Sequence, residues 1–159
     1  MSQADVTHDG TQWSNADDDV VRLSAYDPRW PSLYDEEACR IRRAIGEDFQ
    51  FEIEHFGSTA VAGLAAKPIV DILLIVPARD VWPALVAPLR KLDYVYWAEN
   101  PRPDRMFFVK GMPPYGERRT HHVHVRTPRD AADALLFRDA LRRDPKLASR
   151  YEGLKRELS

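Results

Sequence analysis

One acid and two histidines have the side chains best suited to chemistry in this chain: Asp71, His122 and His124. Asp71 lies near the start of the apolar stretch 69–76, where its carboxylate can bind Mg²⁺ or Mn²⁺ together with phosphate oxygens. His122 and His124 are two residues apart in an alternating stretch, so they share one face of a strand and can bind a metal or a phosphate. If the two strands are neighbours, the three side chains converge on one catalytic metal site; the alternative is a structural histidine pair.

A turn of small residues precedes this acid. Gly57, Ser58 and Thr59 open a predicted short helix that extends to about residue 66, and Lys67 follows it. Backbone N–H groups at a helix N-terminus bind anions, and glycine lets a phosphate approach them. These residues are therefore predicted to bind the phosphates of a nucleotide. The simpler alternative is a helix cap followed by an acid at the start of a strand.

Basic residues surround a predicted hairpin in the second half of the chain. They are Arg102, Arg105, Lys110, Arg118 and Arg119. Such a group can bind a triphosphate or an acidic substrate, and Arg105 and Arg119 are predicted to join the nucleotide site. A solvated hairpin with scattered charge is an equally good interpretation.

Leu73 limits the metal chemistry. Side chains at positions 71 and 73 of a strand point to the same face, and two acids at this spacing can bind two metal ions. Because position 73 is leucine, a mechanism with two metals is doubtful and one divalent metal is expected.

The elements that must position these residues follow from periodicity and from proline and glycine. A helix is expected from Asp27 and Pro28 to Gly46, and another over residues 80–92 with a kink at Pro88. Two helices end the chain, over residues 127–143 and from 144 onward. Strands are expected at 51–55, 69–76, 94–97, 105–110 and 121–126, with a further edge strand at 20–26. This order predicts an α+β fold, close to α/β, with one mixed sheet flanked by helices.

Composition separates a short tail from one domain. Residues 1–19 hold five acids and no Lys or Arg, which favours a disordered acidic tail, and residues 20–159 are predicted to form the domain. The remaining charge is close to neutral, so no nucleic-acid partner is expected. The longest apolar run is too short to cross a membrane, and the single cysteine fits a cytoplasmic protein. The oligomeric state stays open.

Five segments together resemble the GrpB (UPF0157) family, which shares the fold of the nucleotidyltransferase superfamily. They are Tyr26-Asp27-Pro28-x-Trp30, the long motif from His55 to Ile72, His122-x-His124-Val125, Phe137-Arg138-Asp139-x-Leu141-Arg142 and Tyr151-x-x-Leu154-Lys155. Ala62 departs from the proline that is usual in the family. In the superfamily pattern, Gly57, Ser58 and Asp71 match the first elements, and His124 is a candidate for the position of the third acid.

The resemblance implies a nucleotidyltransferase-like enzyme that acts on a small molecule through an NTP or phosphate site with one divalent metal. Two alternatives stay open. One is a non-catalytic module that binds a nucleotide or another anion, with an accessory role linked to coenzyme A biosynthesis in some family members. The other is a ligase or cyclase built on the same site.

Overall fold

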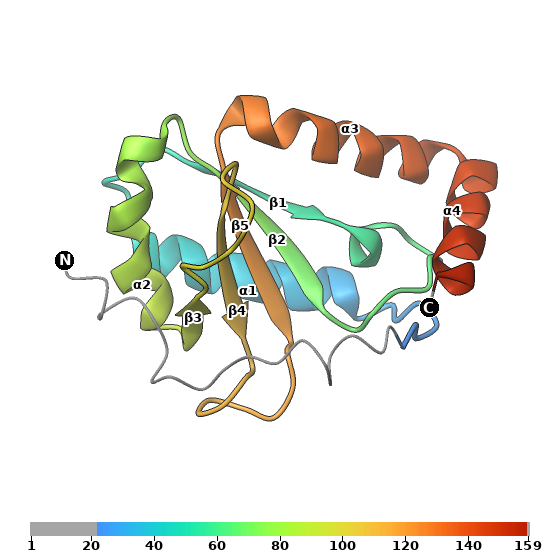
Figure 1. Cartoon of the computed structure of the whole chain (residues 1–159), viewed down its shortest axis with the longest axis horizontal. Coiled ribbons are helices and arrows are strands. Elements are labelled where there is room, and N and C mark those ends of the chain that lie inside the picture. The colour runs from blue at the N-terminus through green and yellow to red at the C-terminus, as the bar shows by residue number, and fades with distance from the viewer. Residues whose placement is uncertain (1–21, 159) are drawn as a thin grey trace.

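The structure, a computed structural model that describes residues 22–158, is organised around a five-stranded mixed sheet (Figure 1). The strands lie in the order β1 (Glu52–Phe56), β2 (Val70–Ile75), β5 (His121–Arg126), β4 (Met106–Lys110) and β3 (Tyr94–Tyr96). β2 and β5 are parallel, and the other neighbours are antiparallel. The predicted α+β fold is confirmed. The predicted tail, residues 1–19, lies outside the described residues.

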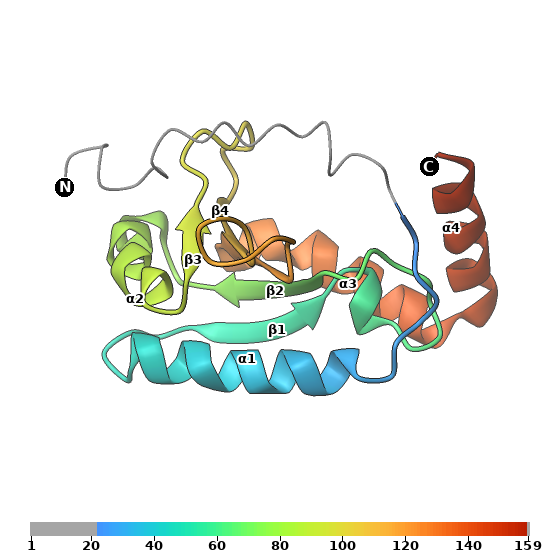
Figure 2. The same ribbon diagram turned by 90° about the horizontal axis from the view of Figure 1, so that it is seen from below.

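One face of the sheet is covered by apolar packing. Helix α1 (Trp30–Ile45) runs beneath β1 and β2 in Figure 2, and a 3-10 helix, η3 (Arg79–Leu85), leads into α2 (Val86–Arg90). Alternate residues of the central strands point into this core, including Ile72, Leu74 and Val123, all fully buried. The alternation that fills this face necessarily turns Asp71, His122 and His124 to the opposite one.

The opposite face is covered only in part. Helix α3 (Pro128–Arg143) places Ala131 against a small cluster formed by Phe56, Leu73 and Ile75. Helix α4 (Pro145–Glu157) follows and packs against the loop between β1 and β2, where Val61, Leu64 and Leu141 form a third cluster. The part of this face that lies between the two contacts carries Asp71, His122 and His124.

The last two helices begin where local chemistry predicts. Thr127 caps α3 by accepting a hydrogen bond from the backbone N–H of Asp130. Asp144 caps α4 in the same way, and each helix has proline in its first turn. Helix α1 begins at Trp30, two residues later than predicted, because the Asp27 carboxylate accepts from the backbone N–H of Arg29 in a turn that precedes the helix.

Two other expected elements differ from the structure. The helix predicted from Ser58 to about residue 66 is only one 3-10 turn, Ser58–Ala60, because Val61 is extended and Gly63 adopts a φ of +81°. The helix predicted over 80–92 is divided into η3 and α2, each of which contains a proline, a residue without a backbone N–H.

The predicted edge strand at 20–26 is reduced, among its described residues, to a single bridge between Ser24 and Ala66. Within the described residues, every helix is too short or too polar to cross a membrane.

Candidate metal and phosphate site

The parallel pairing of β2 with β5 brings the acid and the two histidines together. Its register sets Asp71 opposite His122 and Leu73 opposite His124. The Asp71 Oδ1 atom lies 3.4 Å from His122 Nδ1 and 3.3 Å from His124 Nε2. Ligand atoms bound to one ion at about 2.0–2.2 Å lie roughly 3.0–3.5 Å apart, so these separations suit one metal ion. The structure therefore brings the three predicted metal ligands close enough to hold one ion, with their ligand atoms all within 4.8 Å of one another.

The electrostatic surroundings keep Asp71 ionised. Burial would raise the pKa of this carboxyl, but hydrogen bonds with His122 and His124 outweigh burial and hold its pKa well below the usual range. Burial lowers the pKa of His124 although Asp71 opposes that shift, so the imidazole is neutral near pH 7. An ionised carboxylate beside a neutral His124 imidazole is the state in which both residues can bind a metal.

Arg105 determines which nitrogen of His124 carries the proton. Its NH1 lies 3.3 Å from His124 Nδ1, and a guanidinium can only donate hydrogen bonds. Nδ1 is therefore the acceptor, and Nε2 carries the proton and donates to Asp71. For His124 to bind a metal through Nε2, the proton must move to Nδ1 and the Arg105 contact must be released. His122 has no such restraint, since its Nε2 is buried without a hydrogen-bond partner among the described residues.

Gly57 lies against the acid rather than beside open space. Its φ is +72°, and a Cβ at this position would lie 2.8 Å from Asp71 Oδ2. Any side chain here would displace the carboxylate, besides straining the backbone. Gly57 therefore sets how closely the turn approaches Asp71.

A cavity of about 300 Å³ opens next to the acid. Its polar lining residues are Ser58, Thr59, Lys67, Asp71, His122 and Lys155. Lys155 comes from α4, and its Nζ donates to Ser58 Oγ at 2.7 Å and to the Ala65 carbonyl at 3.1 Å. Burial lowers the pKa of the Lys155 ammonium, although Glu152 and Asp71 oppose that shift. The cavity lining thus combines a carboxylate, an imidazole and two lysines.

The turn residues begin a single 3-10 turn, Ser58–Ala60, rather than a longer helix. Ser58 and Thr59 line the cavity, and their predicted phosphate contacts stay a prediction. The Thr59 hydroxyl is bonded to His55 Nε2 at 2.9 Å. His55 points to the α1 face, where it stacks on Tyr34 at 4.7 Å between ring centroids. His55 therefore contacts the turn from the α1 side of the sheet, through its hydrogen bond with Thr59.

Leu73 is 0% exposed and packs between Phe56, Ile75 and Ala131 beneath α3. The position at which a second acid would complete a two-metal site is part of the apolar core. The expectation of one metal agrees with this packing.

Two predicted nucleotide-binding residues lie outside the cavity lining. Arg105 contacts His124 and Asp104, and Arg119 lies in the connection between β4 and β5. Conversely, sequence reasoning did not place Lys155 at the site. The signal that could have found it is its position in the C-terminal segment that resembles the GrpB family.

Comparison with known proteins identifies relatives over nearly the whole domain. The sequence model described as GrpB protein matches residues 20–159. The UPF0157 protein PA4798 of Pseudomonas aeruginosa is 52% identical over 151 residues, covering 95% of this chain and 62% of that protein. The chain thus spans less than two thirds of that relative's length.

Solved structures agree on the fold. The crystal structure of conserved protein GrpB from Enterococcus faecalis superposes with a TM-score of 0.75 at 33% identity, covering 86% of this chain and 82% of that one. The Cid1 poly(U) polymerase superposes with a TM-score of 0.54 at 15% identity, covering 79% of this chain and 41% of that one. At this identity the second similarity shows the nucleotidyltransferase fold alone.

Proposed function

The chain belongs to the GrpB family, and from this premise we propose that it binds a nucleoside triphosphate at the Asp71 cavity and transfers a nucleotidyl group to a small acceptor. One observation carries the proposal. An ionised carboxylate, the His122 imidazole and two lysines from distant parts of the chain line one cavity, and the His124 imidazole contacts the same carboxylate. Sites that combine anchored cations with a metal-binding carboxylate are suited to phosphoryl and nucleotidyl transfer.

The lysines and the serine account for phosphate binding. Lys67 and Lys155 line the cavity, and each ammonium can hold a phosphate oxygen as a point charge. Ser58 accepts from Lys155, so its own O–H is available to donate to the same phosphate. Since burial disfavours the charge on Lys155, an anion in the cavity would stabilise it.

Asp71, His122 and His124 would hold a divalent metal. Two imidazoles and one carboxylate favour a transition metal such as Mn²⁺ over Mg²⁺, which prefers oxygen ligands. When bound, such an ion would neutralise the phosphate charge that develops as pyrophosphate leaves. The fold neighbour Cid1 has been crystallised with MgGTP, which supports a nucleotide on this type of fold.

A second candidate is a module that binds a nucleotide without turnover. The packing of Leu73 supports it, because burial beneath α3 removes the second acid of a two-metal site. A ligase or cyclase that uses the same phosphate site would also need only one metal. The candidates differ in whether pyrophosphate is released and in which product forms.

Calorimetric titration of ATP and GTP with Mn²⁺ or Mg²⁺ tests the binding site. We expect nucleotide with Mn²⁺ to bind the unaltered protein, Asp71→Asn to weaken binding at least about tenfold, and Lys155→Ala to weaken it by about tenfold. Lys146→Ala removes an exposed lysine from the same helix and should leave the affinity unchanged. Equal affinity in the unaltered protein and Asp71→Asn, or none in either, would contradict the proposal.

Pyrophosphate release separates the candidates. We expect release from the unaltered protein with ATP, Mn²⁺ and small acceptors that carry a hydroxyl or carboxylate, and its loss in Asp71→Asn. Tight nucleotide binding without any release would favour the non-catalytic module.

A further inference from the structure

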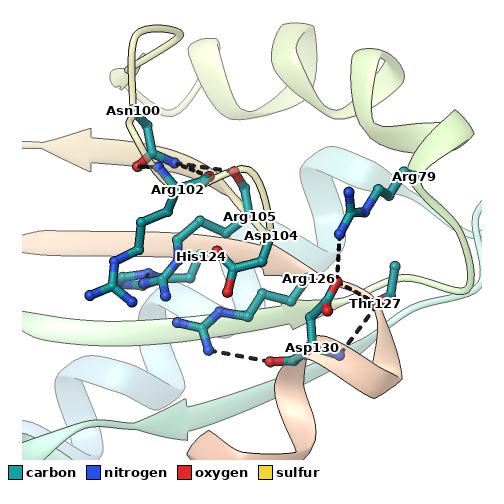
Figure 3. A network of polar contacts seen from close by, with 9 residues as sticks. All are labelled: Arg79, Asn100, Arg102, Asp104, Arg105, His124, Arg126, Thr127 and Asp130. Atoms are coloured by element: carbon teal, nitrogen blue, oxygen red, sulfur yellow. Dashed lines mark hydrogen bonds and ion pairs between the residues drawn. The ribbon is translucent and has the colours of Figure 1, made fainter.

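A group of arginines lies on the same face of the sheet as the metal-binding residues, further along β5. Arg126 ends this strand, two residues beyond His124, and Arg102 and Arg105 come from the loop between β3 and β4. In Figure 3 the guanidinium groups of these three arginines extend toward the same region, with the Asp104 carboxylate between two of them. We refer to Arg102, Arg105 and Arg126 as the arginine cluster.

Arg126 is a buried cation that its surroundings do not fully satisfy. The residue is 7% exposed, and its Nε is buried without a partner in the described part of the chain. Its NH1 reaches only the carbonyl of Asp130, at 3.5 Å. Burial lowers the pKa of Arg126, and the neighbouring Arg105 lowers it further. A guanidinium nevertheless stays charged in proteins, so the cation remains in place.

The nearby acids do not balance the cluster. Asp104 accepts from Arg105 Nε at 3.3 Å and supplies one negative charge against three positive ones. The Asp130 carboxylate belongs to a separate contact, because it accepts from Arg79 at 3.0 Å and from the Thr127 hydroxyl at 2.9 Å. The backbone oxygen of Asp130 accepts the hydrogen bond from Arg126, and the carboxylates of Asp104 and Asp130 interact with Arg126 through charge. An excess of positive charge around a buried guanidinium is therefore left for a ligand to neutralise.

The cluster is physically connected to the metal site. Arg105 contacts both Asp104 and His124, whose other nitrogen contacts Asp71. Residues two apart on a strand are about 6.5–7 Å apart, so Arg126 lies about that far beyond His124 and about twice as far beyond His122. A small molecule with an acid at one end can therefore reach from the arginines to the metal site.

We propose that Arg102, Arg105 and Arg126 bind the carboxylate or phosphate of an acidic acceptor substrate, whose other end lies at Asp71. Planar guanidinium groups bind both anions through paired N–H donors. The role as an acceptor site rests on the proposed function, whereas anion binding by the cluster does not.

Calorimetric titration with succinate and with inorganic phosphate tests the cluster. Because phosphate can also enter the cavity at Lys155, we use Lys155→Ala as the background for both probes. We expect at least one probe to bind this background, and Arg102→Ala or Arg126→Gln to weaken it by about tenfold or more. A preference for succinate indicates a carboxylate acceptor, and a preference for phosphate a phosphorylated one.

Matched variants keep the result independent of folding and of the proposed function. Arg102 is exposed, so its removal should leave the fold intact, as circular dichroism would verify, and Arg129→Ala removes an exposed arginine outside the cluster as a control. Asp71→Asn should retain binding of the small anions even if nucleotide binding fails. Failure of both probes to bind, or an affinity in Arg102→Ala and Arg126→Gln that is unchanged from the Lys155→Ala background, would overturn the arginine cluster as an anion site.

Discussion

On each side of the sheet, a carboxylate lies among basic and aromatic side chains. The hydrogen bonding around the carboxylate differs between the two sides. On the α1 face, Glu37 is 0% exposed and both of its oxygens accept hydrogen bonds. Oε1 accepts from the Tyr94 hydroxyl at 2.9 Å and from Lys110 Nζ at 2.8 Å, and Oε2 accepts from Arg40 at 2.9 Å. Burial would raise the pKa of Glu37, but the hydrogen bonds from Lys110 and Arg40, together with the nearby positive charge, outweigh burial and the pKa is lowered.

On the opposite face, some buried polar atoms have no hydrogen-bond partner in the described part of the chain. Both histidines contact the same oxygen of Asp71, and within residues 22–158 His122 Nε2 and Arg126 Nε are buried without a partner. A buried polar atom without a partner costs free energy, which a ligand that supplies the missing hydrogen bond would recover. The difference supports the proposal that the Asp71 face binds a ligand, whereas the Glu37 network stabilises the fold.

The largest expected effect comes from placing an acid where the Asp71 face is apolar. Leu73→Asp should lower the free energy of unfolding by about 5 kcal/mol, because it removes a buried leucine and buries a carboxyl. It should not create a second metal site. Urea unfolding measures the loss, with Leu136→Asp, 63% exposed on α3, as the control. A stable Leu73→Asp protein with stronger Mn²⁺ binding would refute this assignment of the face.

Removing Glu37 tests whether the network on the α1 side stabilises the fold without affecting metal binding. Glu37→Ala leaves Lys110 and the Tyr94 hydroxyl without their acceptor, and we expect a loss of about 4 kcal/mol in urea unfolding. The exposed neighbour Glu36→Ala should change stability by less than about 0.5 kcal/mol. At temperatures where the variant is folded, its Mn²⁺ affinity should match that of the unaltered protein; a selective loss of metal binding would mean that the two faces are coupled.

His55 predicts a pH dependence of stability. Burial, with Arg142 nearby, lowers its pKa from 6.5 to about 4 in the folded protein. The unfolded chain therefore takes up the proton first, and stability present above pH 6.5 falls as the pH drops toward 4, by up to about 3 kcal/mol.

Unfolding in urea at several pH values between 7 and 4 measures this dependence. His55→Phe removes the titrating group but keeps an aromatic ring against Tyr34. The difference in unfolding free energy between the two proteins should change across this interval. A constant difference would show that the pKa of His55 is the same in the folded and unfolded states.

Gly57→Ala should have the smallest effect on stability and a specific effect on the site. The added Cβ meets Asp71 Oδ2 and the φ of +72° disfavours alanine, so we expect a loss of about 1–2 kcal/mol. Mn²⁺ affinity should fall as the carboxylate is displaced. Gly153→Ala is the matched control, since its Cβ meets nothing within 4 Å and alanine favours α4. Unchanged Mn²⁺ affinity in Gly57→Ala would show that the turn does not position Asp71.

The sequence by itself determined the local features of this protein. The strand at 121–126 and the starts of α3 and α4 follow from side-chain alternation and from caps, which depend on residues a few positions apart. The same local rule placed His122 and His124 on one face and identified Leu73 as a missing acid. Rules of this kind failed at the turn after Gly57, where the backbone of Val61 and Gly63 ends the helix after one turn.

Only the tertiary structure decided how these features meet. The pairing of β2 with β5, which sets Asp71 against His122, joins strands that are separated in the chain by η3, α2, β3 and β4. Lys155 reaches Ser58 from 97 residues away, and α3 makes position 73 part of the core. These contacts depend on which faces of the sheet are covered by helices, and that is set by the burial of apolar surface across the whole domain rather than by any local pattern.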